Sequence, residues 1–366
     1  MTFSQIETLK VCRFRWLFLI CWLFLLPHPA AGDSEALLNE LNRLSPAERE
    51  KRLVEGAKKE GRVLVYSSEN ITLLSAYEAA FTKRYPFLKV EYWRAGGDRV
   101  GARVMTESRA GQLQGDLIGL AFDVAYEIKG TGILARYNSP ERKFYADVFK
   151  DAEGYFTPTN LIHAIIAYNT NLVSPREVPK DYPDLLNPAW KGKLSIDTEP
   201  SRAVMGWLKA WGEEKTRNYL QGLARNDVAV TRGHSLQTQF VCAGQYAAAV
   251  ELYLYTVAGM QRTGCPIGIV YPNPTTVASA QSWAVPKAAP RPHAAALFLD
   301  FILGADGSAL VADEGRIPAR SGVKPKFETL NQVASGKVPV QVLSADDAHR
   351  YGELSDKLVK DLLMRK

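Results

Sequence analysis

Apolar and amphipathic segments alternate along residues 62–130, and this alternation limits the fold more than any other feature. The apolar runs RVLVYSS, FLKVEYW and DLIGLA have the length and composition of short strands. The segments that follow them have the spacing of helices, at residues 71–85, 96–111 and 123–130. This order is the pattern of a parallel sheet with crossover helices, so we predict an α/β fold.

Further strands and helices are predicted on both sides of this region. Ser45-Pro-Ala-Glu48 is a capping box that opens a helix ending at Gly61. LIHAIIAYNT reads as a buried strand, and a second α/β block runs from KGKLSID to CPIGIVYPNP. Residues 292–304 predict a strongly apolar helix and residues 344–366 an amphipathic one. A chain of 366 residues with these two blocks suits two domains.

The first 32 residues have the three parts of a secretory signal peptide. Basic residues precede the apolar run WLFLICWLFLL, which is followed by PHPAAG with small residues suited to cleavage before Asp33. The run is shorter than the roughly 20 residues that a bilayer span needs, although an uncleaved anchor remains an alternative. We therefore expect a mature protein that is exported to the periplasm.

Charge and cysteine content narrow the function classes. The formal net charge of +6 is spread among interspersed acidic residues, so no basic patch for nucleic acid is predicted. Two of the four cysteines lie in the signal peptide, which leaves Cys242 and Cys265. In an oxidising compartment this pair forms either a disulfide or two buried thiols, and their spacing matches no metal motif.

Common catalytic signatures are absent from the sequence. It contains no Walker A loop, no Gly-x-Ser-x-Gly and no His-Glu-x-x-His. We therefore expect a protein that is not an enzyme and has no cofactor, with a secreted hydrolase as the alternative from another class.

Several segments, in order, resemble the periplasmic solute-binding proteins of ABC importers. They are EGAKKEGRVLVYSS, RYPFLKVEY, GDLIG, IIAYNTNLVSPREVPKDYPDLLNPAWKGKLSI and PHAAALFLDFILGADGSALVADEGRIPAR. The subgroup that the chain most resembles is the ferric-iron-type branch of the type 2 fold. The resemblance implies two α/β lobes with the ligand in a cleft between them, closed by a hinge motion.

The resemblance also implies a division of the chain into lobes. The expected parts are a signal peptide, a first lobe, a second lobe, a return to the first lobe and a C-terminal helical segment, at residues 1–32, 33–164, 165–272, 273–330 and 331–366. The expected partners are a small solute and a membrane permease, and the expected state is a monomer. A receptor that reports its ligand to a sensor kinase is an open alternative.

Ligands of open α/β sheets bind beyond the carboxyl ends of the strands, where helix N-termini offer free N–H groups. Polar residues at those ends are therefore the candidate ligand-binding residues. They are Ser67, Ser68, Asn70, Arg94, Asp98, Asp123, Arg202, Arg232, Ser235, Tyr253 and Tyr255. Ser235 is also a candidate helix N-cap, and Trp283 is a further candidate for covering the solute.

The stretch VELYLYT raises the question of iron. In the ferric-binding branch, two adjacent tyrosines, a histidine and a glutamate hold the metal. Here Tyr253 matches the first tyrosine, but the other three matched positions hold Leu254, Asn70 and Ala121. On a strand, Tyr253 and Tyr255 would point to the same side. We therefore expect no metal site and an anionic organic solute, with ferric iron on Tyr253, Tyr255 and Asp123 as the alternative.

Overall fold

The computed structural model describes residues 34–198, 200–273 and 275–364. The predicted signal peptide therefore lies outside the described residues. Two short helices open the described chain, α1 (Ser34–Leu41) and α2 (Pro46–Glu60). Helix α2 has the predicted capping box, because Ser45 accepts from the Glu48 N–H and the Glu48 side chain accepts from the Ser45 N–H. It ends at Gly61, whose φ of 69° is favoured in glycine.

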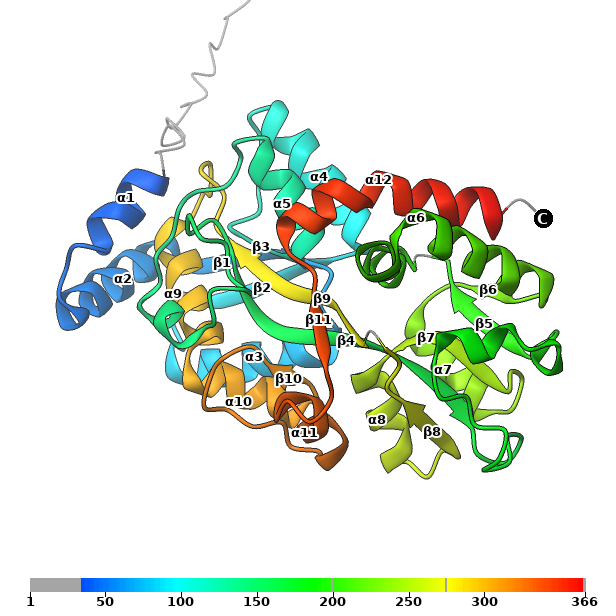
Figure 1. The fold of residues 1–366 in the computed structure, drawn as a ribbon. Helices are drawn as coiled ribbons and strands as arrows, with labels where there is room; N and C mark the ends of the chain where they lie inside the picture. The colour runs from blue at the N-terminus through cyan, green and yellow to red at the C-terminus, as the bar shows by residue number, and fades with distance from the viewer. Residues whose placement is uncertain (1–33, 199, 274, 365–366) are drawn as a thin grey trace, which may run out of the picture.

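A single mixed sheet runs through the molecule and connects its two lobes (Figure 1). The strand order is β2-β1-β3-β9-β4-β7-β5-β6, with β8, β10 and β11 paired outside this path. The central strands β4 (Thr157–Asn169) and β9 (Thr275–Ala284) are long and antiparallel to each other. Because these two strands extend from one lobe into the other, they form the connection between the lobes. The predicted lobe boundaries remain predictions.

The first lobe has the parallel sheet that the sequence predicts. Its strands are β1 (Arg62–Ser67), β2 (Lys89–Arg94) and β3 (Leu117–Ala121), with β1 parallel to both others. The crossover and following helices are α3 (Ile71–Arg84), α4 (Gly97–Arg109) and α5 (Phe122–Gly130). Buried side chains of α3 and α9, such as Leu74 and Phe298, form one continuous core with the sheet.

The second lobe repeats this arrangement with its own core. Its strands are β5 (Leu194–Asp197), β6 (Ala229–Thr231), β7 (Ala248–Tyr253) and β8 (Ile267–Val270). Its helices are α6 (Ser201–Arg225), α7 (His234–Cys242) and α8 (Leu254–Arg262). Helix α6 is interrupted at Gly212, whose φ of 79° lies outside the helical region. Strand β5 is parallel to β6 and β7, whereas β8 runs antiparallel to β4.

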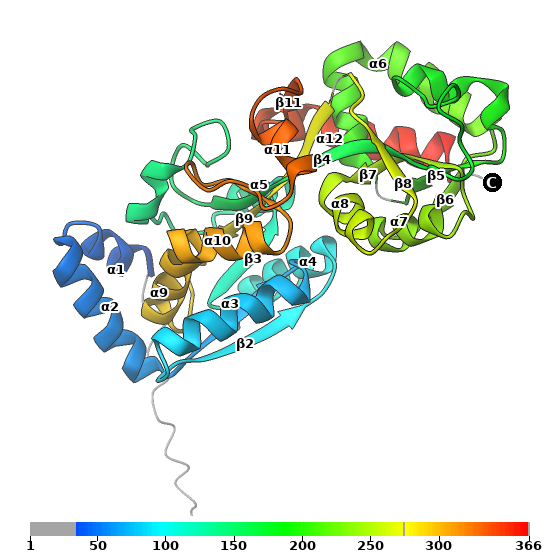
Figure 2. The same ribbon diagram turned by 90° about the horizontal axis from the view of Figure 1, so that it is seen from below.

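The chain returns to the first lobe and then crosses again to the second. Helices α9 (Pro292–Leu303) and α10 (Ala305–Asp313) and strand β10 (Ile317–Pro318) pack in the first lobe. The last elements are α11 (Glu328–Ala334), β11 (Val340–Val342) and α12 (Ala345–Leu362). Helix α12 lies along α6, and its Leu358 and Val359 enter the core of the second lobe (Figures 1 and 2).

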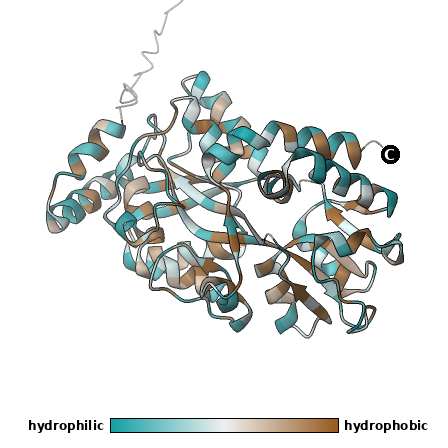
Figure 3. Ribbon diagram, in the orientation of Figure 1, coloured by the Kyte–Doolittle hydropathy of each residue, from teal (hydrophilic) through white to brown (hydrophobic). Residues whose placement is uncertain are grey.

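Burial explains the unusual apolarity of α9. Nine of its residues are buried, and these include the continuous run from Ala294 to Leu299. Within the described residues, no single helix is long and apolar enough to cross a membrane, and α9 and α10 meet that test only as a pair bent by 58°. Figure 3 shows hydrophobic residues along the sheet and the helices packed on it, with hydrophilic residues on outer helical turns.

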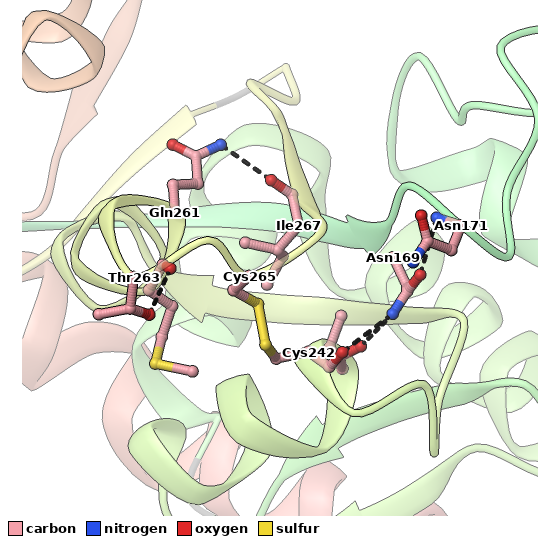
Figure 4. Close-up of a disulfide and its surroundings, with 9 residues drawn as sticks. Asn169, Asn171, Cys242, Gln261, Thr263, Cys265 and Ile267 are labelled. Atoms are coloured by element: carbon pink, nitrogen blue, oxygen red, sulfur yellow. Dashed lines mark hydrogen bonds between the residues drawn. A yellow bond between two sulfur atoms is a disulfide. The ribbon is translucent and has the colours of Figure 1, made fainter.

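Cys242 and Cys265 form a disulfide, which decides between the two expected states of this pair. Cys242 ends α7, and Cys265 lies in the turn between α8 and β8, as Figure 4 shows. Asn169, at the end of β4, donates from its amide to the Val241 and Cys242 carbonyls. The disulfide therefore ties the C-terminal ends of two neighbouring helices together beside the edge of the sheet.

Candidate functional site

The two tyrosines lie side by side, but they do not share a strand. Strand β7 ends at Tyr253 and α8 begins at the next residue, which places Tyr255 in the first helical turn. VELYLYT is therefore not a single strand, and the alternation of side chains along a strand does not apply to this pair. The rings still stack, with centroids 5.9 Å apart and planes inclined by 27°. A strand that passes directly into a helix brings these side chains together at the carboxyl end of β7.

Tyr253 is held by two groups of the second lobe, His234 and Arg202. The His234 ring stacks on it with centroids 3.7 Å apart, and Arg202 Nη1 donates to its hydroxyl at 3.3 Å. His234 Nε2 lies 2.9 Å from the Glu251 carboxylate, and its Nδ1 lies 3.6 Å from Asp197. Burial raises the pKa of the Tyr253 phenol, and the positive charge of Arg202 partly offsets this rise. The phenol therefore stays neutral and can donate a hydrogen bond.

His234 is fixed in a charged environment. Burial lowers the pKa of its imidazole, but the Glu251 and Asp197 carboxylates outweigh burial and raise this pKa overall. Gly233 precedes it with a φ of 92°, and its N–H donates to Asp197 at 2.8 Å. The glycine conformation thus allows α7 to begin directly beside the carboxylate.

Tyr255 faces a buried ion pair that belongs to the first lobe. The Arg316 guanidinium lies 4.2 Å above the Tyr255 ring centroid, and Arg316 Nη2 lies 3.0 Å from Glu69 Oε1. Both charged side chains are at most 5% exposed. Asn160 Nδ2 donates to the Glu69 carboxylate at 3.0 Å, and the Asn70 N–H donates to it at 2.7 Å. Three donors therefore hold the Glu69 carboxylate in place.

An ion pair between Asp123 and Arg202 connects the two lobes. Asp123 lies in the first turn of α5, after β3, and Arg202 lies in the first turn of α6, after β5. Arg202 Nη2 and Asp123 Oδ1 are 3.2 Å apart. Burial lowers the pKa of Arg202, but Asp123 and Tyr253 outweigh it and raise this pKa. Arg202 Nε is buried and has no hydrogen-bond partner among the described residues.

The structure brings several of the sequence-predicted residues together at the boundary between the lobes. They are Asn70, Arg94, Asp123, Arg202, Tyr253 and Tyr255. Asn70 caps α3 by accepting from the Thr72 N–H, and Arg94 Nε donates to the Glu69 carbonyl at 2.6 Å. The positive charges of Arg316 and Arg94 lower the pKa of the Tyr255 phenol, although burial raises this pKa overall.

Other predicted residues lie elsewhere or have internal partners. The Ser67 hydroxyl is fully buried, donates to the Gly119 carbonyl and accepts from the Glu69 N–H. The Ser68 N–H also donates to Gly119. Trp283 is fully buried and donates to the Thr159 hydroxyl, so it is a core residue and not a cover for a solute.

The remaining predicted residues are exposed at helix starts. Asp98 lies in the first turn of α4, and Arg232 and Ser235 flank the start of α7. Ser235 is not the N-cap of α7, because Gly233 occupies that position. Asp98, Arg232 and Ser235 make no ion pair or side-chain hydrogen bond with the described chain, which leaves their place in the site a prediction.

Sequence reasoning missed the charged residues that hold the site in place. Glu69 lies between the candidate residues Ser68 and Asn70, and His234 lies between Arg232 and Ser235, but neither is itself among the candidates. Glu251 lies within the apolar strand β7, and Arg316 follows helix α10. Both are charged residues among buried neighbours, and this is the only sequence signal that could have indicated a role in the site. Among the described residues, no group of three or more His, Cys, Asp or Glu could hold a metal ion.

The lobes lie close together over the two tyrosines. Cavities of about 700 and 760 Å³ open on other faces, the first between α2 and α9 and the second around the connection at residues 172–193. Neither cavity is lined by the tyrosines, Arg202 or Arg316. At the tyrosines, the Asp123–Arg202 pair spans the boundary between the lobes.

Comparisons with known proteins agree with this architecture. The Fe(3+)-binding periplasmic protein of Serratia marcescens is 22% identical over 298 residues, which cover 77% of this chain and 87% of that protein. Iron-bound HitA from Pseudomonas aeruginosa has a TM-score of 0.73 at 17% identity, covering 82% of this chain and 99% of HitA. AfuA from Actinobacillus pleuropneumoniae, with fructose-6-phosphate bound, has a TM-score of 0.72 at 19% identity, covering 84% and 99%.

These solved structures confirm the two-lobed periplasmic binding protein fold that the resemblance implied. The family model for the bacterial extracellular solute-binding proteins matches residues 122–347, which is more than half of the chain. This is a family of binding proteins and not of enzymes. The chain therefore belongs to the bacterial extracellular solute-binding proteins, the periplasmic substrate-binding components of ABC transporters.

Proposed function

We propose that the protein captures a small organic anion between its lobes and delivers it to the membrane permease of an ABC importer. The observation that carries this proposal is the group of guanidinium ions at the paired tyrosines. Arg202 donates to Tyr253, Arg316 lies over Tyr255, and Arg94 lies beside them. Guanidinium groups bind carboxylate and phosphate oxygens with charge-assisted hydrogen bonds.

The carboxylates of the site are already paired with cationic groups, whereas one arginine nitrogen lacks a partner among the described residues. Glu69 is paired with Arg316, and Glu251 with His234, so neither is available to hold a cationic solute. Arg202 Nε, by contrast, is a buried donor without a partner among the described residues. Because unpaired buried donors are costly, a solute oxygen at this position would stabilise the closed protein.

The proposed binding mode divides the solute into two parts. Its carboxylate, phosphate or phosphonate would lie at Arg202, near the N-termini of α5 and α6, where helix dipoles favour negative charge. The faces of Tyr253 and Tyr255 would cover its apolar part. The structural likeness to AfuA with fructose-6-phosphate bound supports a phosphate ester as one member of this class. The protein would be exported through cleavage of residues 1–32 and act as a monomer.

A ferric-ion carrier is the second candidate. The names of the Serratia marcescens relative and of iron-bound HitA favour it, as does the contact between two phenols. Ferric iron would bind both phenols as phenolates, which requires it to displace their protons. Each phenol also faces an arginine, whose positive charge opposes a trivalent cation at the same place. We therefore place this candidate second.

Native mass spectrometry of residues 33–366, purified from a periplasm without chelators, separates the two candidates. We expect an organic adduct that is lost on denaturation. An adduct of one iron, together with the visible colour of a ferric tyrosinate, would overturn the proposal in favour of the second candidate.

Calorimetry with Arg202→Ala tests the anion site itself. Loss of charge-assisted hydrogen bonds to the solute should weaken binding of the identified anion by at least about tenfold. Arg217→Ala is the matched control, because Arg217 lies on the same helix and its one ion pair within the described residues is with Glu213. Equal affinities for the two variants would refute the role of Arg202.

A further inference from the structure

The Asp123 carboxylate contacts the groups that would bind an anion, namely the Arg202 guanidinium and a helix N-terminus. The Asp123 carboxylate lies in the first turn of α5, in contact with one terminal nitrogen of Arg202, whose other terminal nitrogen donates to the Tyr253 hydroxyl. A guanidinium and a helix N-terminus are the groups that recognise an anionic ligand. Here both act on a carboxylate of the protein itself.

Both partners are accessible, which separates this pair from the buried pairs of the site. The side chains of Asp123 and Arg202 are 22% and 21% exposed, whereas Glu69 and Arg316 are 2% and 5% exposed. An external anion can reach this partly exposed pair and compete with Asp123 for Arg202. Opening of the Glu69–Arg316 pair would instead leave a charge buried without a partner.

We infer that the Asp123 carboxylate occupies the place of the solute's anionic group, so that Asp123 holds the ligand-free protein closed and the solute must displace it from Arg202. This inference rests on the proposed function. It assigns Asp123 the role of an internal competitor, in place of the ligand contact that the sequence predicts. The Asp123 carboxylate lies at Nη2 of Arg202 and would repel a solute anion brought to the same nitrogen, so a solute that binds Arg202 there displaces Asp123.

Competition with Asp123 would raise the specificity of the site for particular anions and lower its affinity for all of them. A solute must bind Arg202 better than a carboxylate that is already in place, which selects anions that also satisfy Arg202 Nε or the tyrosines. Removing the competitor should strengthen binding of every anion that uses Arg202. It should also release the ligand-free lobes.

The test uses the mature protein and Asp123→Asn, with Glu127→Gln as the matched control. Glu127 is an exposed acid one turn further along α5, and no ion pair of Glu127 is present in the described chain. Electron-electron resonance between spin labels at Thr106 on α4 and Glu214 on α6, both exposed, reports the separation of the lobes without any ligand. We expect longer distances for Asp123→Asn and the wild-type distribution for Glu127→Gln.

Calorimetry with fructose 6-phosphate and with citrate completes the test. We expect Asp123→Asn to bind the anion that the wild type binds at least about fivefold more tightly. Weaker binding by Asp123→Asn would show that Asp123 contacts the solute. An unchanged distance between the lobes in this variant would show that Asp123 does not hold the lobes together. Either result overturns the inference. Longer distances with no binding of either anion by any variant would support the closing contact while refuting the proposed solute class.

Discussion

Removal of the disulfide is the perturbation whose magnitude follows most directly from the structure. Cys242 and Cys265 are 23 residues apart in sequence, and both are partly exposed, so serine at each position adds little cost of its own. The entropy of closing a loop of this length predicts that the double change Cys242→Ser with Cys265→Ser lowers the free energy of unfolding by about 3 kcal/mol. The disulfide joins α7, which begins at His234, to the turn after α8.

Urea unfolding followed by circular dichroism measures this loss. With a slope of roughly 3 kcal/mol per molar urea for a chain of this size, the midpoint should fall by about 1 M. Dithiothreitol supplies the control: it should lower the wild-type midpoint to that of the double variant and leave the variant unchanged. A difference below about 1 kcal/mol between oxidised wild type and variant would refute the loop-closure reasoning.

Three further outcomes are expected from buried groups. Burial lowers the pKa of His163 from 6.5 to about 4, so folding favours the neutral imidazole. The free energy of unfolding should therefore fall by roughly 3 kcal/mol as the pH drops from 6.5 to 4, and His163→Gln should remove this loss in acid unfolding curves. Glu69→Ala leaves Arg316 buried without its carboxylate and should cost about 3–5 kcal/mol in urea, with part regained by adding Arg316→Met; no regain would contradict the pairing. Gly119→Ala places a methyl group 2.6 and 2.7 Å from two buried side chains and should lower stability by about 1–3 kcal/mol. Gly130→Ala meets no atom of the described residues within 4 Å and should change stability by less than about 0.5 kcal/mol; equal effects on unfolding would refute the packing argument.

The sequence by itself determined the elements and their order. The capping box at Ser45, the strands of the first lobe and the apolar helix after Pro292 are all present where local patterns place them. These features are predictable because caps and hydrophobic periods act within a few residues of the chain. Their order, together with the resemblance, was sufficient for the two-lobed α/β fold.

The features that local patterns did not predict are the boundaries between neighbouring elements and the burial of single side chains. The cap expected at Ser235 falls on Gly233, and strand β7 ends at Tyr253, so that Tyr255 belongs to helix α8. Trp283 has the residue type of a solute cover but lies in the core. Trp283 donates to Thr159, which is 124 residues away, and local propensity does not report a contact of this kind.

The tertiary structure alone decided which charges meet. Asp123 and Arg202 are 79 residues apart and come from different lobes, and Glu69 and Arg316 are brought together by the return of the chain after α10. The sequence indicated both Asp123 and Arg202 as ligand-binding residues, but it could not show that these two side chains form an ion pair with each other. Pairing of charges depends on through-space distance and burial, and both are fixed only when the crossing strands β4 and β9 set the lobes against each other.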